Sequence, residues 1–264
     1  MDLKTDRTTG IKRSIAFYLI LTSVVLTSAY FFAMSGALIA YSIIILIAYI
    51  LKKREGGFRW GVSWKSGFLF GLVLISSIFI LELALGWIKL EEMYPNVFYI
   101  LTGAVIFELL VSLGEEMSFR GYILPNLIKS IGQRNAILTT SFLFAGLHLP
   151  SILLLGMGKF NSIIMFATIT AAGILMALLY LTGGLKMSSG FHFSWNFFQY
   201  HVFSLRSGFG IFGLTATNPE FTGGLAGPEA GVIGLFVLIL GILMLLASVK
   251  NKYLNAIFGC NHHD

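Results

Sequence analysis

Residues 161–182 read NSIIMFATITAAGILMALLYLT, an apolar stretch in which no charged side chain occurs. A helix needs about 20 apolar residues to cross the hydrocarbon core of a bilayer, so this stretch is long enough to do so. Similar apolar runs recur along the chain, at 14–33, 36–51, 67–88, 98–114, 136–155, 187–204 and 229–249. Lipid offers the backbone no hydrogen-bond partner, so each run should be a helix. The sequence therefore predicts an all-α, polytopic transmembrane helical bundle of about eight spans.

The composition excludes a soluble globular protein. Of the 264 residues, 56% are hydrophobic and 11% are charged, whereas soluble domains average about 25% charged residues. The net charge of +6 does not indicate a nucleic-acid partner, because the basic residues lie in short clusters between the apolar runs. The single cysteine, Cys260, excludes an intrachain disulfide and a cysteine-based metal site. We expect one integral membrane domain, residues 1–264, with the lipid bilayer as its partner.

The lysines and arginines predict the orientation of the chain. If the N-terminus is cytoplasmic and every run crosses the membrane, all but three of the 18 basic residues lie in cytoplasmic segments. The exceptions are Lys89, Lys159 and Arg206. This distribution follows the positive-inside rule. We therefore expect a multi-pass protein of the cell membrane with both termini in the cytoplasm.

Charged residues inside apolar runs are candidates for function, because a charge at the bilayer centre costs about 2.5–3.5 kcal/mol. Glu115, Glu116 and Arg120 lie at the cytoplasmic end of the fourth run. Glu116 and Arg120 are four residues apart and share a helix face, so they can form an ion pair. Glu115 is rotated by about 100° and is left available for chemistry. An ordinary charged helix end is the alternative interpretation.

Two histidines also lie within apolar runs. His148 follows Phe144 by one helical turn and precedes Pro150, which should break the helix. His192 and Asn196 are four residues apart, so both point to one side of the seventh run. A lone histidine such as His148 could instead hydrogen-bond across helices as a packing residue.

Together these side chains are the parts of a hydrolytic site. A carboxylate beside a histidine can deprotonate water, and an imidazole with a carboxamide can stabilise the resulting oxyanion. Alternatively, Glu115, His148 and His192 could hold a catalytic zinc ion with one open position. Glu82 and Glu108 are further acids within apolar runs, and each could line the site or make a structural hydrogen bond.

The order Glu-Glu-x-x-x-Arg, Phe-x-x-x-His, His-x-x-x-Asn resembles a known family of intramembrane proteases. This is the CPBP family (CAAX protease and bacteriocin-processing, also called Abi), and in particular its Rce1-like CAAX endopeptidases. The sequence LTGGL at 181–185, before the third motif, is also similar to the family. The resemblance covers about residues 98–200, which we expect to be the catalytic core.

The resemblance implies a role for each motif residue. Glu115 would be the general base that activates water, assisted by His148. His192 and Asn196 would form the oxyanion hole. Glu116 and Arg120 would support the structure. No cofactor is favoured, because Asn196 suits an oxyanion hole and asparagine is a poor zinc ligand.

The resemblance also implies a substrate class. Such enzymes act near the cytoplasmic side of the membrane on peptides or C-terminal tails, which can be prenylated. A non-catalytic bacteriocin-immunity factor or peptide-binding membrane protein is the first alternative. A transporter is the second, suggested by Glu82 and Glu108, although the absence of an internal repeat argues against it.

Overall fold

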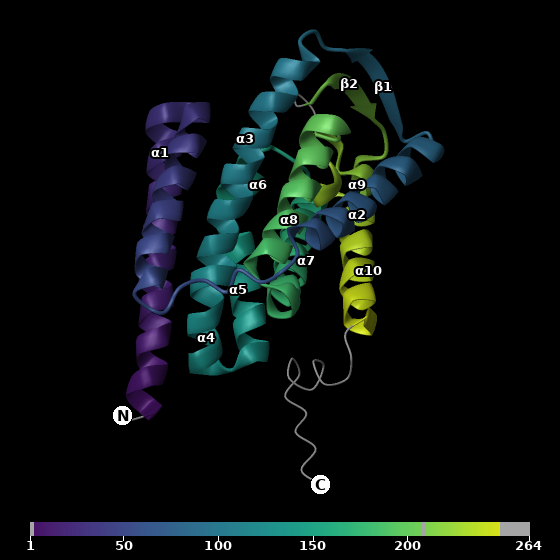
Figure 1. Cartoon of the computed structure of the whole chain (residues 1–264). Helices are drawn as coiled ribbons and strands as arrows, with labels where there is room; N and C mark the ends of the chain where they lie inside the picture. The colour runs from purple at the N-terminus through teal and green to yellow at the C-terminus, as the bar shows by residue number, and fades with distance from the viewer. Residues whose placement is uncertain (1–2, 207–209, 249–264) are drawn as a thin grey trace.

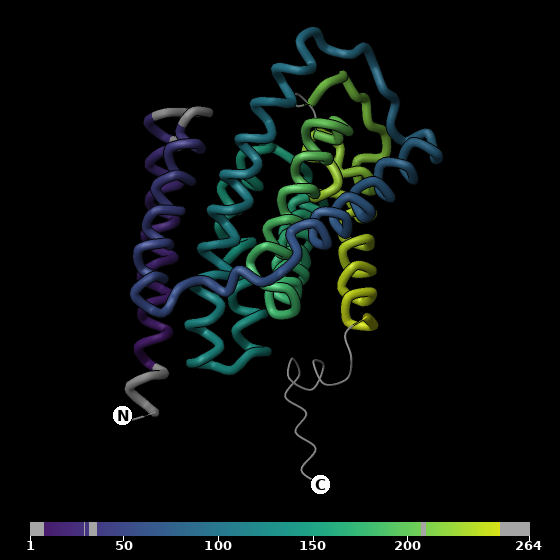
Figure 2. Tube along the Cα trace, in the orientation of Figure 1, coloured from purple at the N-terminus to yellow at the C-terminus, as the bar shows by residue number. Residues whose placement is uncertain are grey.

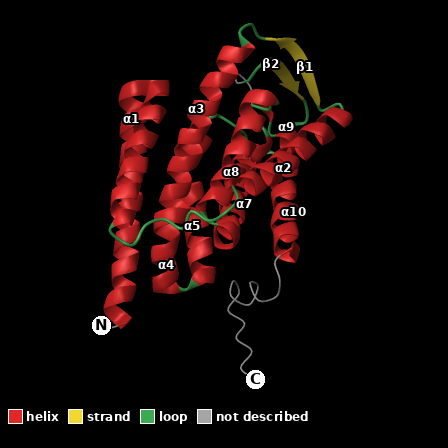
Figure 3. Cartoon of the chain, in the orientation of Figure 1, coloured by secondary structure: helices red, strands yellow, loops and turns green. Residues whose placement is uncertain are grey.

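The computed structural model describes residues 3–206 and 210–248, with their side chains except at 3–7, 29 and 32–35. Both chain ends, whose cytoplasmic location was predicted, therefore lie outside the described residues. Within the described part, helices dominate the structure (Figures 1 and 3). The predicted all-α helical bundle is confirmed, with one addition, a small two-stranded sheet.

Helix α1 (Leu3–Lys53) folds back on itself as two antiparallel spans. Its two apolar stretches are Thr8–Ser28 and Gly36–Lys53. The guanidinium of Arg13 lies 3.2 Å from the carboxylate of Glu55. A straight helix rises about 1.5 Å per residue and would hold these two groups far apart. The second half therefore returns beside the first, as the tube in Figure 2 shows.

Helix α2 (Trp64–Ala84) packs closely against α8 (Leu185–Asn196) through glycines. A Cβ atom at Gly67 would overlap the backbone oxygen of Met187. A Cβ atom at Gly190 would overlap the backbone oxygen of the first residue of α2. Small residues let helix backbones approach closely in membranes. Helix α2 thus holds in place the helix that carries the third motif.

One continuous helical segment carries the first motif. Helix α3 (Val97–Glu116) runs directly into the π-helix η1 (Met117–Ile123) and then into α4 (Leu124–Ile131). A π-helix has hydrogen bonds between residues five apart and is frequent at functional sites. Glu115 and Glu116 are the last two residues of α3, so the π-helix begins immediately after them.

The second motif lies at a helix break. Helix α5 (Gln133–Leu147) ends next to His148, and the short helix α6 (Leu149–Leu154) begins just after it. Pro150 lies in the first turn of α6, so the break predicted at this proline is confirmed. The segments that follow are α7 (Lys159–Gly183), α8, and a second π-helix, η2 (Phe197–Val202), that continues α8.

The connections between spans form a structured cap at the end of the bundle opposite the start of α1 (Figure 1). Strands β1 (Ile88–Met93) and β2 (Phe212–Ala216) pair in antiparallel fashion. The sequence placed both connections on the same side of the membrane, but did not predict that they pair. The cap continues with α9 (Pro219–Thr222), η3 (Gly224–Ala226) and η4 (Pro228–Ala230), and α10 (Val232–Ser248) then runs back along the bundle.

Five stretches of the described chain are long and apolar enough to cross a membrane. They are Thr8–Ser28, Gly36–Lys53, Trp64–Ala84, Val97–Ile131 and Lys159–Gly183, and α10 is a shorter apolar helix. The chain is therefore a polytopic membrane protein. The total of about eight spans and the location of the termini stay predictions.

The contact between α2 and α8 can be tested by adding a methyl group. We expect Gly67→Ala to lower the melting temperature of the purified protein in detergent by several degrees, because overpacking costs about 1–3 kcal/mol. Gly103→Ala, in α3, is the matched control, since apart from its chain neighbours and the nearby backbone of its own helix no heavy atom lies within 4 Å of its Cβ position. Equal melting temperatures for Gly67→Ala and the wild type would contradict the close contact.

The predicted orientation can be tested with single cysteines in a Cys260→Ser background. Glu92 in β1 and Arg54 after α1 are both exposed and lie in connections predicted on opposite sides of the membrane. We expect a membrane-impermeant maleimide to label Glu92→Cys in intact cells, and Arg54→Cys only after permeabilisation. The reverse pattern would show that the N-terminus is extracytoplasmic.

Candidate active site

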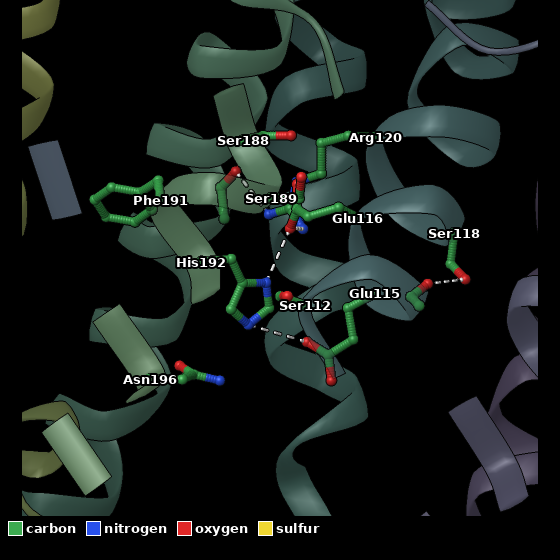
Figure 4. Close-up of polar contacts among 12 residues, drawn as sticks. Ser112, Glu115, Glu116, Ser118, Arg120, Ser188, Ser189, Phe191, His192 and Asn196 are labelled. Atoms are coloured by element: carbon green, nitrogen blue, oxygen red, sulfur yellow. Dashed lines mark hydrogen bonds and ion pairs between the residues drawn. The ribbon is translucent and has the colours of Figure 1, made fainter. Parts of the chain in front are cut away.

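Glu116 joins three parts of the structure through buried polar contacts. Its Oε1 atom accepts hydrogen bonds from Arg120 Nη1 at 2.9 Å and from His192 Nδ1 at 3.1 Å (Figure 4). Arg120 also donates from Nη2 to the backbone oxygen of Gly173 in α7, at 3.1 Å. Its guanidinium lies 4.6 Å from the ring centre of Phe144. The predicted ion pair is thus present, and it connects α3, α7 and α8.

Glu115 lies on the other side of the His192 ring (Figure 4). Its Oε2 atom is 3.7 Å from His192 Nε2, and its Oε1 atom accepts a 2.5 Å hydrogen bond from the hydroxyl of Tyr41. The 3.7 Å separation is too long for a direct hydrogen bond, but one water molecule can bond to both atoms. Glu115 is only 3% exposed. The carboxylate is therefore buried, oriented by Tyr41 and placed beside an imidazole.

His148 is held at the junction of α5 and α6. Its Nδ1 atom lies 2.8 Å from the backbone oxygen of Phe144. A carbonyl oxygen can only accept, so Nδ1 carries the proton and Nε2 of the neutral ring is a hydrogen-bond acceptor. The Phe144 ring contacts both histidines, with centroids 4.9 Å from His148 and 6.2 Å from His192. In the described structure Glu115 and His148 make no direct hydrogen bond, so they can cooperate only through a molecule between them.

Asn196 contacts a carboxylate from outside the three motifs. Its Nδ2 atom donates to Glu108 Oε2 at 3.1 Å. The other oxygen of Glu108, Oε1, lies 2.9 Å from Nε2 of His201. Glu108 is 2% exposed. The carboxamide of Asn196 is therefore oriented by a buried pair from α3 and η2.

The four predicted catalytic residues line one cavity of 460 Å³. Ligand pockets in proteins commonly occupy about 300–1,000 Å³ and combine apolar walls with a few convergent polar groups. The polar lining includes Glu115, His148, His192 and Asn196, with Tyr41, Glu108 and His201. The apolar lining includes Phe107, Val111, Phe144, Met165, Ile169 and Leu238. Glu116 and Arg120 do not line it and instead support the wall from behind.

The cavity extends from Glu115 toward the cap. Its lining residues on α3 all lie between Phe107 and Glu115, in the direction of the start of that helix. Arg206 and Glu229, from the cap connections, also line it. The cavity thus lies between the middle of the continuous segment Val97–Ile131 and the cap. The cytoplasmic locations of the N-terminus and of the active site both stay predictions. The cysteine-labelling experiment above decides which side this cavity faces.

The segment that carries the three motifs matches a known family. Residues 97–198 match the model of the family described as Rce1-like, type II CAAX prenyl endopeptidase. This segment belongs to the Rce1-like family. No match to the chain is found among curated proteins.

The side chains that were predicted as alternative zinc ligands are not arranged as a metal site in the described structure. No group of three or more histidine, cysteine, aspartate or glutamate side chains that could hold a metal ion is found in the described part of the chain. Glu115, His148 and His192 line the same cavity without forming such a group. The effect of a zinc chelator on activity tests the zinc hypothesis directly.

Two residues at the Rce1-like site were missed by the sequence analysis. Tyr41 comes from α1, outside the matched segment, and nothing in its apolar surroundings marks it. His201 is a polar residue within an aromatic run, five residues after Asn196, and that position is a signal that could have been used. Glu108 was noted without a role, and its two partners are now known.

The buried ion pair gives a stability prediction. We expect Arg120→Met to lower the free energy of unfolding in detergent by about 3–5 kcal/mol, because it leaves Glu116 buried without its guanidinium partner. The double variant Glu116→Gln/Arg120→Met should be less unstable than the sum of the single variants, since both charges are removed. Exposed Arg134→Met is the control. Strictly additive losses would contradict the coupling.

Proposed function

We propose that this chain is an intramembrane endopeptidase that hydrolyses a peptide bond with a water molecule activated by Glu115. The observation that carries the proposal is the convergence of three separate motifs on one cavity inside the bundle. Membership of the matched segment in a family of prenyl endopeptidases supports the same reaction class.

In the first step, Glu115 acts as the general base. A water molecule hydrogen-bonded to its carboxylate attacks the carbonyl carbon of the substrate, and the carboxylate takes the proton. The hydroxyl of Tyr41 holds Oε1 in place, which leaves Oε2 on the side of His192. His148 assists by accepting a hydrogen bond at Nε2, because its Nδ1 hydrogen is already bonded to the backbone oxygen of Phe144.

In the second step, nitrogen donors stabilise the negative oxygen of the tetrahedral intermediate. Asn196 uses one Nδ2 hydrogen for Glu108 and has a second one for the substrate oxygen. His192 uses its Nδ1 hydrogen for the hydrogen bond to Glu116, so its Nε2 atom carries no proton in the neutral ring. The adjacent Glu115 can transfer to Nε2 the proton that it took from water, and Nε2 can then donate a hydrogen bond to the substrate oxygen. This transfer makes Glu115 a carboxylate again. As the carbon–nitrogen bond breaks, the Nε2 proton of His192 passes to the leaving amine and the imidazole returns to its neutral form.

The proposed substrate is a peptide or a protein C-terminal tail, including a prenylated one. The apolar side chains of Phe107, Val111 and Ile169 line the cavity beside the catalytic groups and suit an apolar residue or lipid group. A non-catalytic immunity or peptide-binding role would use the same cavity, but the family match favours the enzyme.

The test is cleavage of a panel of fluorogenic C-terminal peptides, prenylated and unprenylated, by purified protein in lipid. We expect Glu115→Gln to lower kcat at least about 100-fold, because a general base contributes about 10²–10⁴-fold. His148→Ala and His192→Ala should also lose activity. Glu229→Gln is the control, because it changes a carboxylate that lines the same cavity but belongs to none of the three motifs. The melting temperature of each variant shows whether it is folded.

Each outcome of this experiment has a distinct meaning. Activity that survives a zinc chelator but is lost in Glu115→Gln supports the metal-free mechanism. Activity lost on chelation and restored by zinc would replace it with the metal mechanism. Full activity of all three motif variants would refute the proposed site, and peptide binding without cleavage would favour the binding role.

A further inference from the structure

A carboxylate and a histidine outside the three motifs hold the Asn196 side chain from behind. Glu108 Oε2 accepts from Asn196 Nδ2 at 3.1 Å, and Glu108 Oε1 lies 2.9 Å from His201 Nε2. Glu108 is 2% exposed, and the side chain of His201 is 13% exposed. A buried carboxylate requires partners, and these two nitrogens engage both of its oxygens.

The π-helix explains how one carboxylate reaches both residues. Asn196 and His201 are five residues apart, and in an α-helix that spacing separates side chains by about 140° around the axis. The wider turn of a π-helix reduces this angle. The π-helix η2 begins directly after Asn196, and the backbone N–H of Phe203 bonds to the oxygen of Phe198, five residues earlier. The irregular turn thus brings His201 toward the face that Asn196 occupies.

We propose that Glu108 and His201 are positioning residues that orient the Asn196 carboxamide for the substrate oxyanion. A carboxamide can rotate about its last bond and exchange its N–H and C=O ends. A carbonyl turned toward an oxyanion would repel it. The acceptor Glu108 bonds only to the N–H₂ end, and His201 fixes Glu108 in turn, so the second Nδ2 hydrogen is directed elsewhere, toward the cavity that Asn196 lines.

This inference rests on the proposed protease function, and a double-mutant cycle tests it. We expect Glu108→Leu to lower kcat by about 10-fold to 100-fold with little change in KM, since removing an oxyanion donor altogether costs about 10²–10³-fold. In an Asn196→Ala background, Glu108→Leu should have no further effect. Glu108→Gln can keep both hydrogen bonds and should retain most of the activity.

His201→Phe provides a second variant that leaves Glu108 and Asn196 intact. We expect His201→Phe to lower kcat less than Glu108→Leu does. This loss should also vanish in the Asn196→Ala background. Glu229→Gln is the control, because its carboxylate bonds to Tyr200 at 2.7 Å and not to Asn196. Any effect of Glu229→Gln should be equal in both backgrounds. A loss from Glu108→Leu that is as large without Asn196 as with it would overturn the proposal.

A second measurement does not depend on cleavage. With protein labelled with ¹⁵N at asparagine, the side-chain amide signal of Asn196 is identified by its absence in Asn196→Ala. We expect this signal to shift in both Glu108→Leu and His201→Phe, and to stay near its wild-type position in Glu229→Gln. An unchanged Asn196 signal in Glu108→Leu would overturn the positioning role even if no substrate is cleaved.

Discussion

The carboxylate of Glu116 is the contact on which the rest of this site depends. It accepts from Arg120 one turn later in the chain and from His192 on α8, and Arg120 continues the connection to the backbone of α7. A charge buried this completely is tolerated only when it is paired and hydrogen-bonded. Because the partners come from distant segments, the helices must pack in one arrangement to satisfy it. The same arrangement places Glu115 beside the imidazole that Glu116 orients.

The helical class could be predicted because membrane helices are determined by local composition. The length of each apolar run, the reversal between the first two runs and the break at Pro150 all follow from neighbouring residues. The β1–β2 pair could not be predicted, since it joins short segments more than 100 residues apart. The span count is also hard to confirm from composition, because α5, which ends next to His148, and α8, which carries His192 and Asn196, are both short.

The site divides in the same way into local and distant contacts. The spacing of Glu116 and Arg120 predicted their ion pair, because residues four apart on a helix are neighbours. The contacts Tyr41–Glu115 and Glu108–His201 bridge 74 and 93 residues of sequence and depend on how helices pack. There is a further reason why helical periodicity cannot identify His201 as a residue of the site. Its side chain reaches Glu108 through a π-helix, which residue spacing read at 3.6 residues per turn does not reveal.

The glycine contact between α2 and α8 has a consequence for the rigidity of the cavity walls. Backbone atoms of the two helices meet with no side chain between them at Gly67 and Gly190. Side chains can change rotamer to accommodate a ligand, whereas helix backbones in direct contact have no such freedom. Under the proposed function, we therefore expect the wall that carries His192 and Asn196 to move less on substrate binding than the walls lined by side chains of α1, α7 and α10.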